Sequence, residues 1–215
     1  MKITDSNISN ENIFSEAMNA KWKLFHFILS FLFTPFYHIY FFIKGIRYGK
    51  KWRLYGNPII HKYKGSKIHI GDNFINRNWF SSNPVGIDHP SLFTTWNIDS
   101  EIMIGNNVGI SGGIICAFKK IIISDNVMIG ANVRIMDTDF HPVNPDTRRF
   151  GKDDVNSKPI FIGKNVLIGA NSIILKGVSI GDNSIIGANS LVVQDIPEGV
   201  IAGGNPAKVI KNIAN

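Results

Sequence analysis

Between Ile98 and Ile196 the chain repeats every six residues, and this period fits neither an α-helix nor a plain alternating strand. An α-helix needs apolar residues at spacings of three and four, and a half-buried strand needs strict alternation. A short fixed repeat instead predicts a solenoid, whose stacked coils share one core. The clearest run places an aliphatic residue at every sixth position: Ile162, Ile168, Ile174, Ile180, Ile186 and Val192.

The same frame continues upstream. It passes through Ile123, Ile129 and Ile135 and, offset by one extra residue, through Ile98, Ile104, Ile110 and Cys116. Fragments such as IGANVR, IGKNVL and IGANSI put an aliphatic side chain in the interior, while glycine and asparagine adopt the positive φ of tight corners. These fragments resemble the hexapeptide-repeat acyltransferases. The resemblance implies an all-β solenoid, a left-handed parallel β-helix of triangular section.

Composition divides the chain into three parts. Residues 1–55 form a hydrophobic, basic extension that we expect to be helical, residues 56–97 a transitional segment that caps the solenoid, and residues 98–215 the β-helix with its C-terminal cap. Within the β-helix we expect an outward loop over residues 142–158. The transitional segment carries four aromatic residues, which either plug the open end of the solenoid or stack on a sugar: Trp79, Phe80, Phe93 and Trp96.

Charge and cysteine content limit the classes of function. The net charge is +7, from 23 Lys and Arg against 16 Asp and Glu, and residues 21–53 hold seven of the basic residues and no acidic one. Because charge nearly cancels elsewhere, we expect no nucleic-acid-binding face. The single cysteine, Cys116, excludes a disulfide framework and a cysteine-based metal site, and we interpret it as a small buried side chain.

Residues 24–43 form an uncharged, apolar stretch of 20 residues. As one straight helix it would reach roughly 30 Å, about the thickness of a bilayer's hydrocarbon core, although Pro35 should kink or split it. A helix would gather four polar residues into one stripe: His26, Ser30, Thr34 and His38. Three arrangements are open: a membrane-embedded or re-entrant hairpin, an ordinary span, or a pair of helices packed on the solenoid or a neighbouring subunit. The flanking basic residues favour a cytoplasmic solenoid in either membrane case.

The repeat breaks after Ile135, where the sequence MDTDFHPVNPDTRRFGKDDVNSKP precedes the next hexad near Ile160. A solenoid accommodates an insertion of this kind as an outward loop, and such loops are common binding sites. Repeat counting places His141 where the next inward aliphatic residue belongs. A histidine followed by Pro142 breaks the local rule there without a packing reason, which indicates a functional residue.

The segment DTDFHPVNPDTRR resembles the corresponding loop of galactoside-type, maltose-type and polysaccharide O-acetyltransferases. In these enzymes a histidine followed by proline opens the loop and is the catalytic base, so the resemblance implies that role for His141. A neutral imidazole can take the proton of a sugar hydroxyl while the oxygen attacks a thioester carbonyl. Asp139 is the expected orienting partner, and Asp137 is the alternative and a further residue near the acceptor.

The resemblance also implies binding residues for acceptor and donor. Galactoside-type enzymes carry an acceptor-contacting asparagine thirty residues before the histidine, where this chain has Ser111, which can still hydrogen-bond an acceptor. The closing segment IAGGNPAKVIK is similar to the family's C-terminal cap, whose basic residues meet the phosphates of coenzyme A. The residues implied to bind acetyl-CoA are Ala170, Ala188, Val193, Gln194, Lys208 and Lys211.

Two metal-dependent functions do not fit the sequence. Asp137, Thr138 and Asp139 spell the D-x-D of metal-dependent glycosyltransferases, but a match of three residues arises easily by chance. The γ-type carbonic anhydrases use a related β-helix with three zinc-binding histidines, whereas this solenoid offers only His141. We therefore expect no metal.

Taken with the loop and the cap, the resemblance predicts an acetyl-CoA-dependent O-acetyltransferase that acts on a sugar hydroxyl without a covalent enzyme intermediate. The apolar N-terminal part favours an acceptor in a polysaccharide or a lipid-linked glycan precursor, and a membrane surface as a partner of residues 21–53. We expect a cytoplasmic homotrimer, because family members associate as trimers with sites between subunits. Two alternatives stay open: an N-acyltransferase on a nucleotide-linked amino sugar, and a structural or binding β-helix without enzyme activity.

Overall fold

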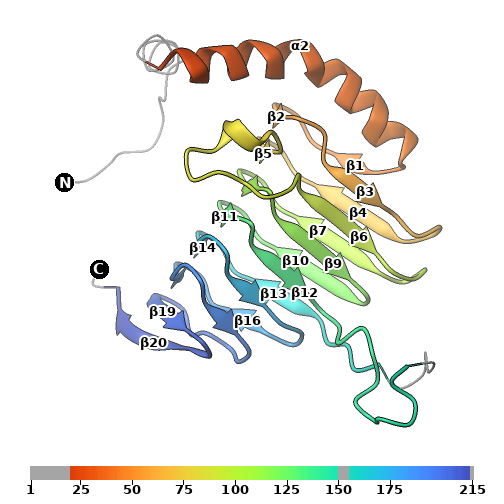
Figure 1. Cartoon of the computed structure of the whole chain (residues 1–215), viewed down its shortest axis with the longest axis vertical. Coiled ribbons are helices and arrows are strands. Elements are labelled where there is room, and N and C mark those ends of the chain that lie inside the picture. Colours follow the sequence, from red (N-terminus) through yellow and green to blue (C-terminus); the bar gives the residue numbers. More distant parts are fainter. Residues whose placement is uncertain (1–19, 150–154, 214–215) are drawn as a thin grey trace.

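The computed structural model describes residues 20–149 and 155–213. In this part of the chain one long helix, α2 (Lys21–Ile43), lies across the end of a β-helix (Figure 1). The β-helix consists of three sheets, here called A, B and C, and each coil passes through them in that order. Successive coils pair in parallel, which confirms the predicted all-β solenoid.

Each sheet is a stack with one strand from every coil. Sheet A contains β1 (Arg47–Tyr48), β4 (Lys67–Ile70), β7 (Glu101–Ile104), β10 (Lys120–Ile123), β13 (Ile160–Ile162) and β16 (Ser179–Ile180). Sheet B contains β2 (Arg53–Tyr55), β5 (Ile75–Arg77), β8 (Gly109–Ser111), β11 (Met128–Ala131), β14 (Leu167–Ile168), β17 (Ile185–Ile186), β19 (Val200–Gly204) and β20 (Ala207–Asn212), which folds back antiparallel on β19. Sheet C contains β3 (Ile59–His61), β6 (Leu92–Thr95), β9 (Ile114–Ala117), β12 (Arg134–Met136), β15 (Ile173–Ile174) and β18 (Leu191–Val192).

The interior of the later coils is filled by the aliphatic residues that define the repeat. All six residues of the run from Ile162 to Val192 are at most 2% exposed. Each lies directly above or below its counterpart in the next coil, as Ile162 pairs with both Ile123 and Ile180. The six-residue period is therefore the spacing between equivalent inward positions on consecutive sheets.

The upstream frame differs from the prediction at two positions. Ile98 is 60% exposed in the turn before β7, and Ile102 fills the interior at that level instead. In sheet C, Ile115 pairs with Ile135 at the inward position, so Cys116 lies one residue further along β9. Cys116 is nevertheless only 6% exposed, and this burial raises the pKa of its thiol to about 11. The interpretation of Cys116 as a small buried side chain is confirmed.

Asparagine and glycine have separate roles at the corners, which we name A–B, B–C and C–A after the sheets they join. Five asparagines with positive φ stack at the A–B corner and hydrogen-bond side chain to side chain at 2.8–3.0 Å: Asn73, Asn107, Asn126, Asn165 and Asn183. The glycine of the hexad does not supply positive φ as predicted. At Gly169, a Cβ atom would lie 2.4 Å from the backbone nitrogen of Ala188 in the next coil. Its missing side chain is what lets the coils stack.

The β-helix begins at Arg47 rather than near residue 98. The strands β1 to β6 form two coils that pair in parallel with each other and with β7, β8 and β9, so residues 56–97 build coils instead of a separate cap. Their interior holds larger residues, such as Phe74 and Phe93, which hide the six-residue period. A long B–C corner over residues 78–91, which includes the short 3₁₀ helix η1 (Phe80–Ser82), interrupts the period further.

The helix α2 covers the first coil without a break (Figure 1). Pro35 lies inside it and does not split it, so the structure contradicts both the predicted hairpin and the predicted pair of helices. The polar stripe faces the coil: His26 is 7% exposed and Ser30 is 3% exposed. Burial, together with the nearby charge of Arg77, lowers the pKa of the His26 imidazole, so this ring is neutral at pH 7.

Candidate functional site

The predicted base, His141, lies on a loop that leaves the C–A corner between β12 and β13 (Figure 1). At the base of the loop Thr138 forms an antiparallel bridge with Ser157, whose Oγ donates to Thr138 Oγ1 at 2.9 Å. His141 is exposed beyond this bridge and does not occupy the inward position that repeat counting gave it. The counting fails because the chain has already left the coil at Asp137.

Asp137 holds the start of this loop. Its carboxylate is fully buried and accepts hydrogen bonds from three consecutive backbone N–H groups, those of residues 118–120, at 2.6–2.7 Å. Burial raises the pKa of the carboxyl group, and the three N–H donors oppose that shift. Both oxygens thus accept backbone hydrogen bonds, and Asp137 fixes where the loop departs from the coil. Its predicted contact with a substrate stays a prediction.

Asp139 faces a lysine rather than the histidine. Its Oδ1 lies 2.5 Å from the Nζ of Lys176, which belongs to the C–A corner of the next coil, and its backbone N–H donates to Asn156 at 3.1 Å. Within residues 20–149 and 155–213, the ring of His141 has no hydrogen-bond partner. In this chain alone, Asp139 therefore ties the loop to the coil and does not orient His141 as predicted.

The B–C corner carries the other group of predicted residues in a stacked column. Backbone hydrogen bonds of 2.7–3.0 Å join consecutive coils there, from Asn132 to Ser111, from Asn171 to Ala131 and from Asn189 to Ala170. The column of small side chains consists of Ser111, Ala131, Ala170 and Ala188. Ala131 was missed because sequence reasoning carried over only single positions and did not follow the stack. Ser111 and Ala131 are buried, whereas Ala170 is partly exposed and Ala188 is exposed, so an extended ligand can approach the backbone at the last two.

The two predicted lysines lie on β20, in the hairpin that closes the β-helix. Lys208 pairs with Gly203 and Lys211 with Ile201 across the hairpin, and both lysine side chains are exposed. The hairpin adjoins the B–C column, since the backbone N–H of Gly204 donates to Ser190 Oγ at 3.2 Å. Val193 and Gln194, by contrast, are exposed in the turn after β18 at the C–A corner.

One chain therefore does not bring the predicted site together. His141, Asp139, Val193 and Gln194 belong to the C–A corner, whereas Ser111, Ala170 and Ala188 belong to the B–C corner. These two corners lie at opposite edges of sheet C, because a strand of that sheet connects them in every coil.

Sequence reasoning missed the long corner over residues 78–91, which covers part of the B–C column. Asn83 Nδ2 donates to Ser111 Oγ at 2.9 Å, and the backbone N–H of Asp88 donates to Asn132 Oδ1 at 2.9 Å. His89 follows, with Nδ1 3.0 Å from the carbonyl oxygen of Pro90 and a buried Nε2 that has no partner among the described residues. The signal was a second histidine–proline pair in a segment where the repeat also fails.

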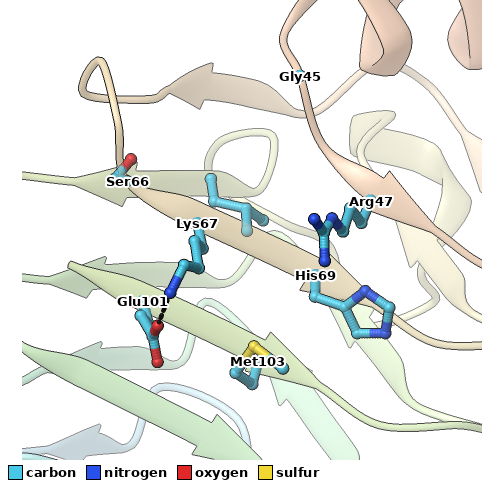
Figure 2. Close-up of a pocket in the computed structure, with 8 residues that line it drawn as sticks. Gly45, Arg47, Ser66, Lys67, His69, Glu101 and Met103 are labelled. Carbon is cyan, nitrogen blue, oxygen red and sulfur yellow. Dashed lines mark hydrogen bonds and ion pairs between the residues drawn. The ribbon is translucent and has the colours of Figure 1, made fainter. Parts of the chain in front are cut away.

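A cavity of about 550 Å³ lies on the outer face of sheet A near the first three coils. Figure 2 shows Arg47 and His69 on one side of it and the ion pair of Lys67 with Glu101, 2.7 Å long, on the other. Hydrogen bonds from Lys67 and then from Lys120 lower the pKa of the Glu101 carboxyl group. Among the described residues, including those of this cavity, no three His, Cys, Asp or Glu side chains lie close enough together to hold a metal ion.

Comparison with known proteins places this geometry in a family. The hexapeptide repeat of succinyl-transferases matches residues 159–194. A putative acetyltransferase of Dictyostelium discoideum is 38% identical over 165 residues, which are 76% of this chain and 84% of that protein. The chain belongs to the hexapeptide-repeat acetyltransferases. Membership in this family confirms the left-handed hand of the parallel β-helix, which the resemblance implied.

Two further comparisons concern a curated relative and a solved structure. The galactoside O-acetyltransferase of Lactococcus lactis is 44% identical over 116 residues, and the match spans 51% of this chain and only 55% of that enzyme. A mutant of AntD, an N-acyltransferase from Bacillus cereus solved in complex with dTDP and coenzyme A, superposes with a TM-score of 0.59 at 20% identity, covering 80% of this chain and 88% of that one. This likeness concerns the fold.

Proposed function

We propose that this hexapeptide-repeat acetyltransferase transfers an acetyl group from acetyl-CoA to a hydroxyl group of a sugar. The observation that carries the proposal is the position of His141, exposed on an outward loop whose base is fixed by Asp137 and by the bridge between Thr138 and Ser157. His141 is open to a substrate, and these contacts fix the start of the loop that carries it. The relatives named galactoside O-acetyltransferase support a sugar hydroxyl as the acceptor.

In the proposed reaction His141 takes the proton of the acceptor hydroxyl as its oxygen attacks the thioester carbonyl of acetyl-CoA. The tetrahedral intermediate then collapses, the C–S bond breaks, and the proton passes from the imidazolium to the leaving thiolate. The products are the acetyl ester of the sugar and free coenzyme A. The negative oxygen of the intermediate needs a hydrogen-bond donor, for which we propose a backbone N–H group at the B–C corner.

The donor is proposed to lie along the column of Ala131, Ala170 and Ala188. Small side chains there let an extended pantetheine arm approach the backbone closely. At the end of the column, Lys208 and Lys211 are exposed on β20, where their ammonium groups can meet the phosphates of coenzyme A. Val193 and Gln194 are proposed to contact the same donor from a neighbouring subunit, because they lie at the other corner of their own chain.

A homotrimer follows from the same separation. His141 and the B–C column lie at opposite edges of sheet C, so the base of one chain must meet the column of another. Association around a three-fold axis would place the C–A corner of each chain beside the B–C corner of its neighbour at every interface. Asp139 pairs with Lys176 in the single chain. In the trimer it would also lie within reach of side chains from the neighbouring chain.

The acceptor is proposed to be part of a polysaccharide or of a lipid-linked glycan precursor, modified in the cytoplasm where acetyl-CoA is made. Ser111 supports an acceptor other than a small galactoside, because its short side chain is already hydrogen-bonded to Asn83. The exposed apolar face of α2 supports a reaction close to a membrane. The alternative acceptor is an amino sugar linked to a nucleotide. We retain this alternative because the fold is similar to that of AntD, an N-acyltransferase.

The test compares His141→Ala with His61→Ala, since His61 is also exposed but lies on β3, away from the loop. Both purified proteins are incubated with labelled acetyl-CoA and matched hydroxy-sugar and amino-sugar acceptors, and products are identified by mass. We expect His141→Ala to reduce O-acetylation by about 100-fold or more, with coenzyme A affinity unchanged, and His61→Ala to behave as the parent protein. Near-normal turnover in a folded His141→Ala protein would exclude the mechanism, and acetylation of amino sugars alone would favour the alternative.

A further inference from the structure

The helix α2 is docked with its polar side inward and its apolar side outward. Of the polar stripe, His26 and Ser30 are buried on the side of α2 that faces the β-helix. The opposite face exposes eight large apolar side chains, each between 49% and 76% accessible: Phe25, Ile28, Phe31, Leu32, Phe36, Ile39, Phe42 and Ile43. Contiguous apolar surface of this extent is rare on soluble monomers and marks a binding surface.

Contacts at both ends of α2 hold it flat on the coil. Near its start, His26 Nε2 lies 3.0 Å from Ser81 Oγ, and the ring of His26 packs on Trp79 at 5.7 Å between centroids. Near its end, Phe41 is fully buried, and its ring meets Trp52 edge-on at 5.2 Å. By length and composition α2 could also cross a bilayer. Crossing would separate these contacts from the coil, so the docked helix must lie parallel to any surface it binds.

A groove beside α2 combines apolar and cationic walls. It has a volume of about 380 Å³, and Phe27 and Phe31 of the helix line one part, with the cations Lys51 and Arg53 of the first coil on another. The hydroxyl-bearing Ser30 and Thr34 also face it. The aromatic part of the groove can contact an acyl chain and the cations can bind a phosphate, so the groove is chemically complementary to an anionic phospholipid.

Charge favours lipid over a second copy of this chain. Residues 21–53 contain seven basic residues and no acidic one, and Lys21, Lys44, Lys50 and Lys51 are all exposed. Two copies of residues 21–53 brought together would repel each other, because this segment contains no carboxylate. The headgroups of an anionic bilayer attract the same cations, at about 1 kcal/mol for each residue near the surface.

We propose that α2 is an in-plane membrane anchor that lies in the interface of an anionic phospholipid bilayer, with its apolar face toward the acyl chains and a lipid headgroup held by Lys51 and Arg53. The β-helix then stands away from the bilayer on the opposite side of α2 (Figure 1). This inference does not depend on the proposed reaction, because it rests on the helix and the first two coils alone.

The first test measures flotation of the full-length protein with vesicles of phosphatidylcholine, with or without phosphatidylglycerol. We expect binding to the anionic vesicles. Phe31→Asp combined with Phe42→Asp, at two side chains that are 76% exposed, should weaken it by about 100-fold or more. The matched control is Ile210→Asp, at a 67% exposed position on β20 at the other end of the β-helix, and should bind as the parent does.

The cationic part of the surface is tested separately. Lys51→Gln with Arg53→Gln should reduce the preference for anionic over neutral vesicles by about tenfold or more, whereas Lys164→Gln, at an exposed position several coils away, should not. Binding that survives the paired aspartates, or an absence of binding to anionic vesicles, would overturn the proposal. The proposal would also be overturned if the parent protein formed an oligomer without lipid and the double aspartate variant did not, because a second copy would then cover the apolar face.

A labelling experiment distinguishes an α2 that lies in the membrane plane from one that spans the bilayer. Cys116 is buried, so Lys21→Cys and Lys44→Cys each introduce one accessible thiol at one end of α2. With protein added to preformed sealed vesicles, an impermeant thiol reagent applied outside should label both positions to the same extent. Protection of one end until detergent is added would mean that α2 spans the bilayer, and the in-plane orientation would be wrong.

Discussion

A methyl group added at Gly169 tests whether coil stacking depends on the missing side chain of the hexad. The new Cβ would lie 2.4 Å from the backbone nitrogen and 2.7 Å from the Cα of Ala188. Ordinary contacts begin at 3.4 Å, so the first distance is short by 3.4 − 2.4 = 1.0 Å. Both atoms are backbone and cannot rotate away, so the two coils must separate or shift.

The cost can be set from similar overpacking in other cores. Forcing an extra methyl group into a well-packed site costs about 1–3 kcal/mol. For a chain of this size, each kcal/mol lowers Tm by roughly 2–4 °C, so Gly169→Ala should lower it by roughly 2–12 °C. The control is Gly187→Ala at the same corner of the next coil, where the nearest atom would be 3.6 Å from the Cβ. That change should leave Tm unaltered or raise it slightly, because alanine restricts the unfolded chain.

Thermal unfolding followed by circular dichroism measures both variants under one buffer and one protein concentration. Because separating the coils at Gly169 would displace Ala170 and Ala188 of the proposed donor column, coenzyme A affinity should fall with Tm in Gly169→Ala. In Gly187→Ala the new Cβ meets no atom closer than 3.6 Å, so affinity should stay constant. Equal Tm values for the two variants would refute the steric argument. A loss of affinity without a loss of stability would mean instead that the methyl group blocks the ligand directly.

Three further outcomes are expected. Glu101→Gln should lower the free energy of unfolding by less than about 1 kcal/mol at pH 7. Because the pKa of Glu101 is depressed in the folded protein, the difference between variant and parent should vanish as the pH falls below the ordinary glutamate range. Urea titrations measure this difference, and a value that stays constant with pH would contradict the ion pairs. Cys116, with a thiol pKa of about 11, should resist thiol reagents at pH 8 until the protein unfolds, and rapid native labelling would contradict its burial. Replacing Lys208 and Lys211 together by Ala should weaken binding of coenzyme A more than of pantetheine in calorimetry, whereas equal losses would indicate a damaged hairpin.

The later coils could be predicted because each hexad repeats one local solution. From Ile162 to Val192 every sixth side chain meets the same interior, so the period appears directly in the sequence. The first coils use the same sheets with Phe74 and Phe93 inside and a long corner over residues 78–91, and no fixed spacing remains. Their membership in the β-helix depends on pairing with later strands, which a local pattern does not contain.

At the candidate site the sequence singled out His141 but did not predict what surrounds the loop that carries it. His141 stands out because it ends a regular pattern. The partners of Asp137 and Asp139 are set by the stacking of coils: residues 118–120 lie one coil earlier, and Lys176 lies one coil later. Likewise, the polar stripe of α2 followed from its spacing, but the direction it faces depends on the coil beneath it.

The number of stacked coils also sets the distance between α2 and the loop that carries His141. The loop with His141 leaves the fourth coil, three steps beyond the coil on which α2 lies. At about 4.8 Å for each step, the histidine's coil stands roughly 14 Å above the first. With α2 in the bilayer surface, a sugar joined directly to a lipid would pass beneath the base, and only residues further along a glycan would reach it. Chain length of the acceptor, measured in sugar units, would then be selected by the number of coils.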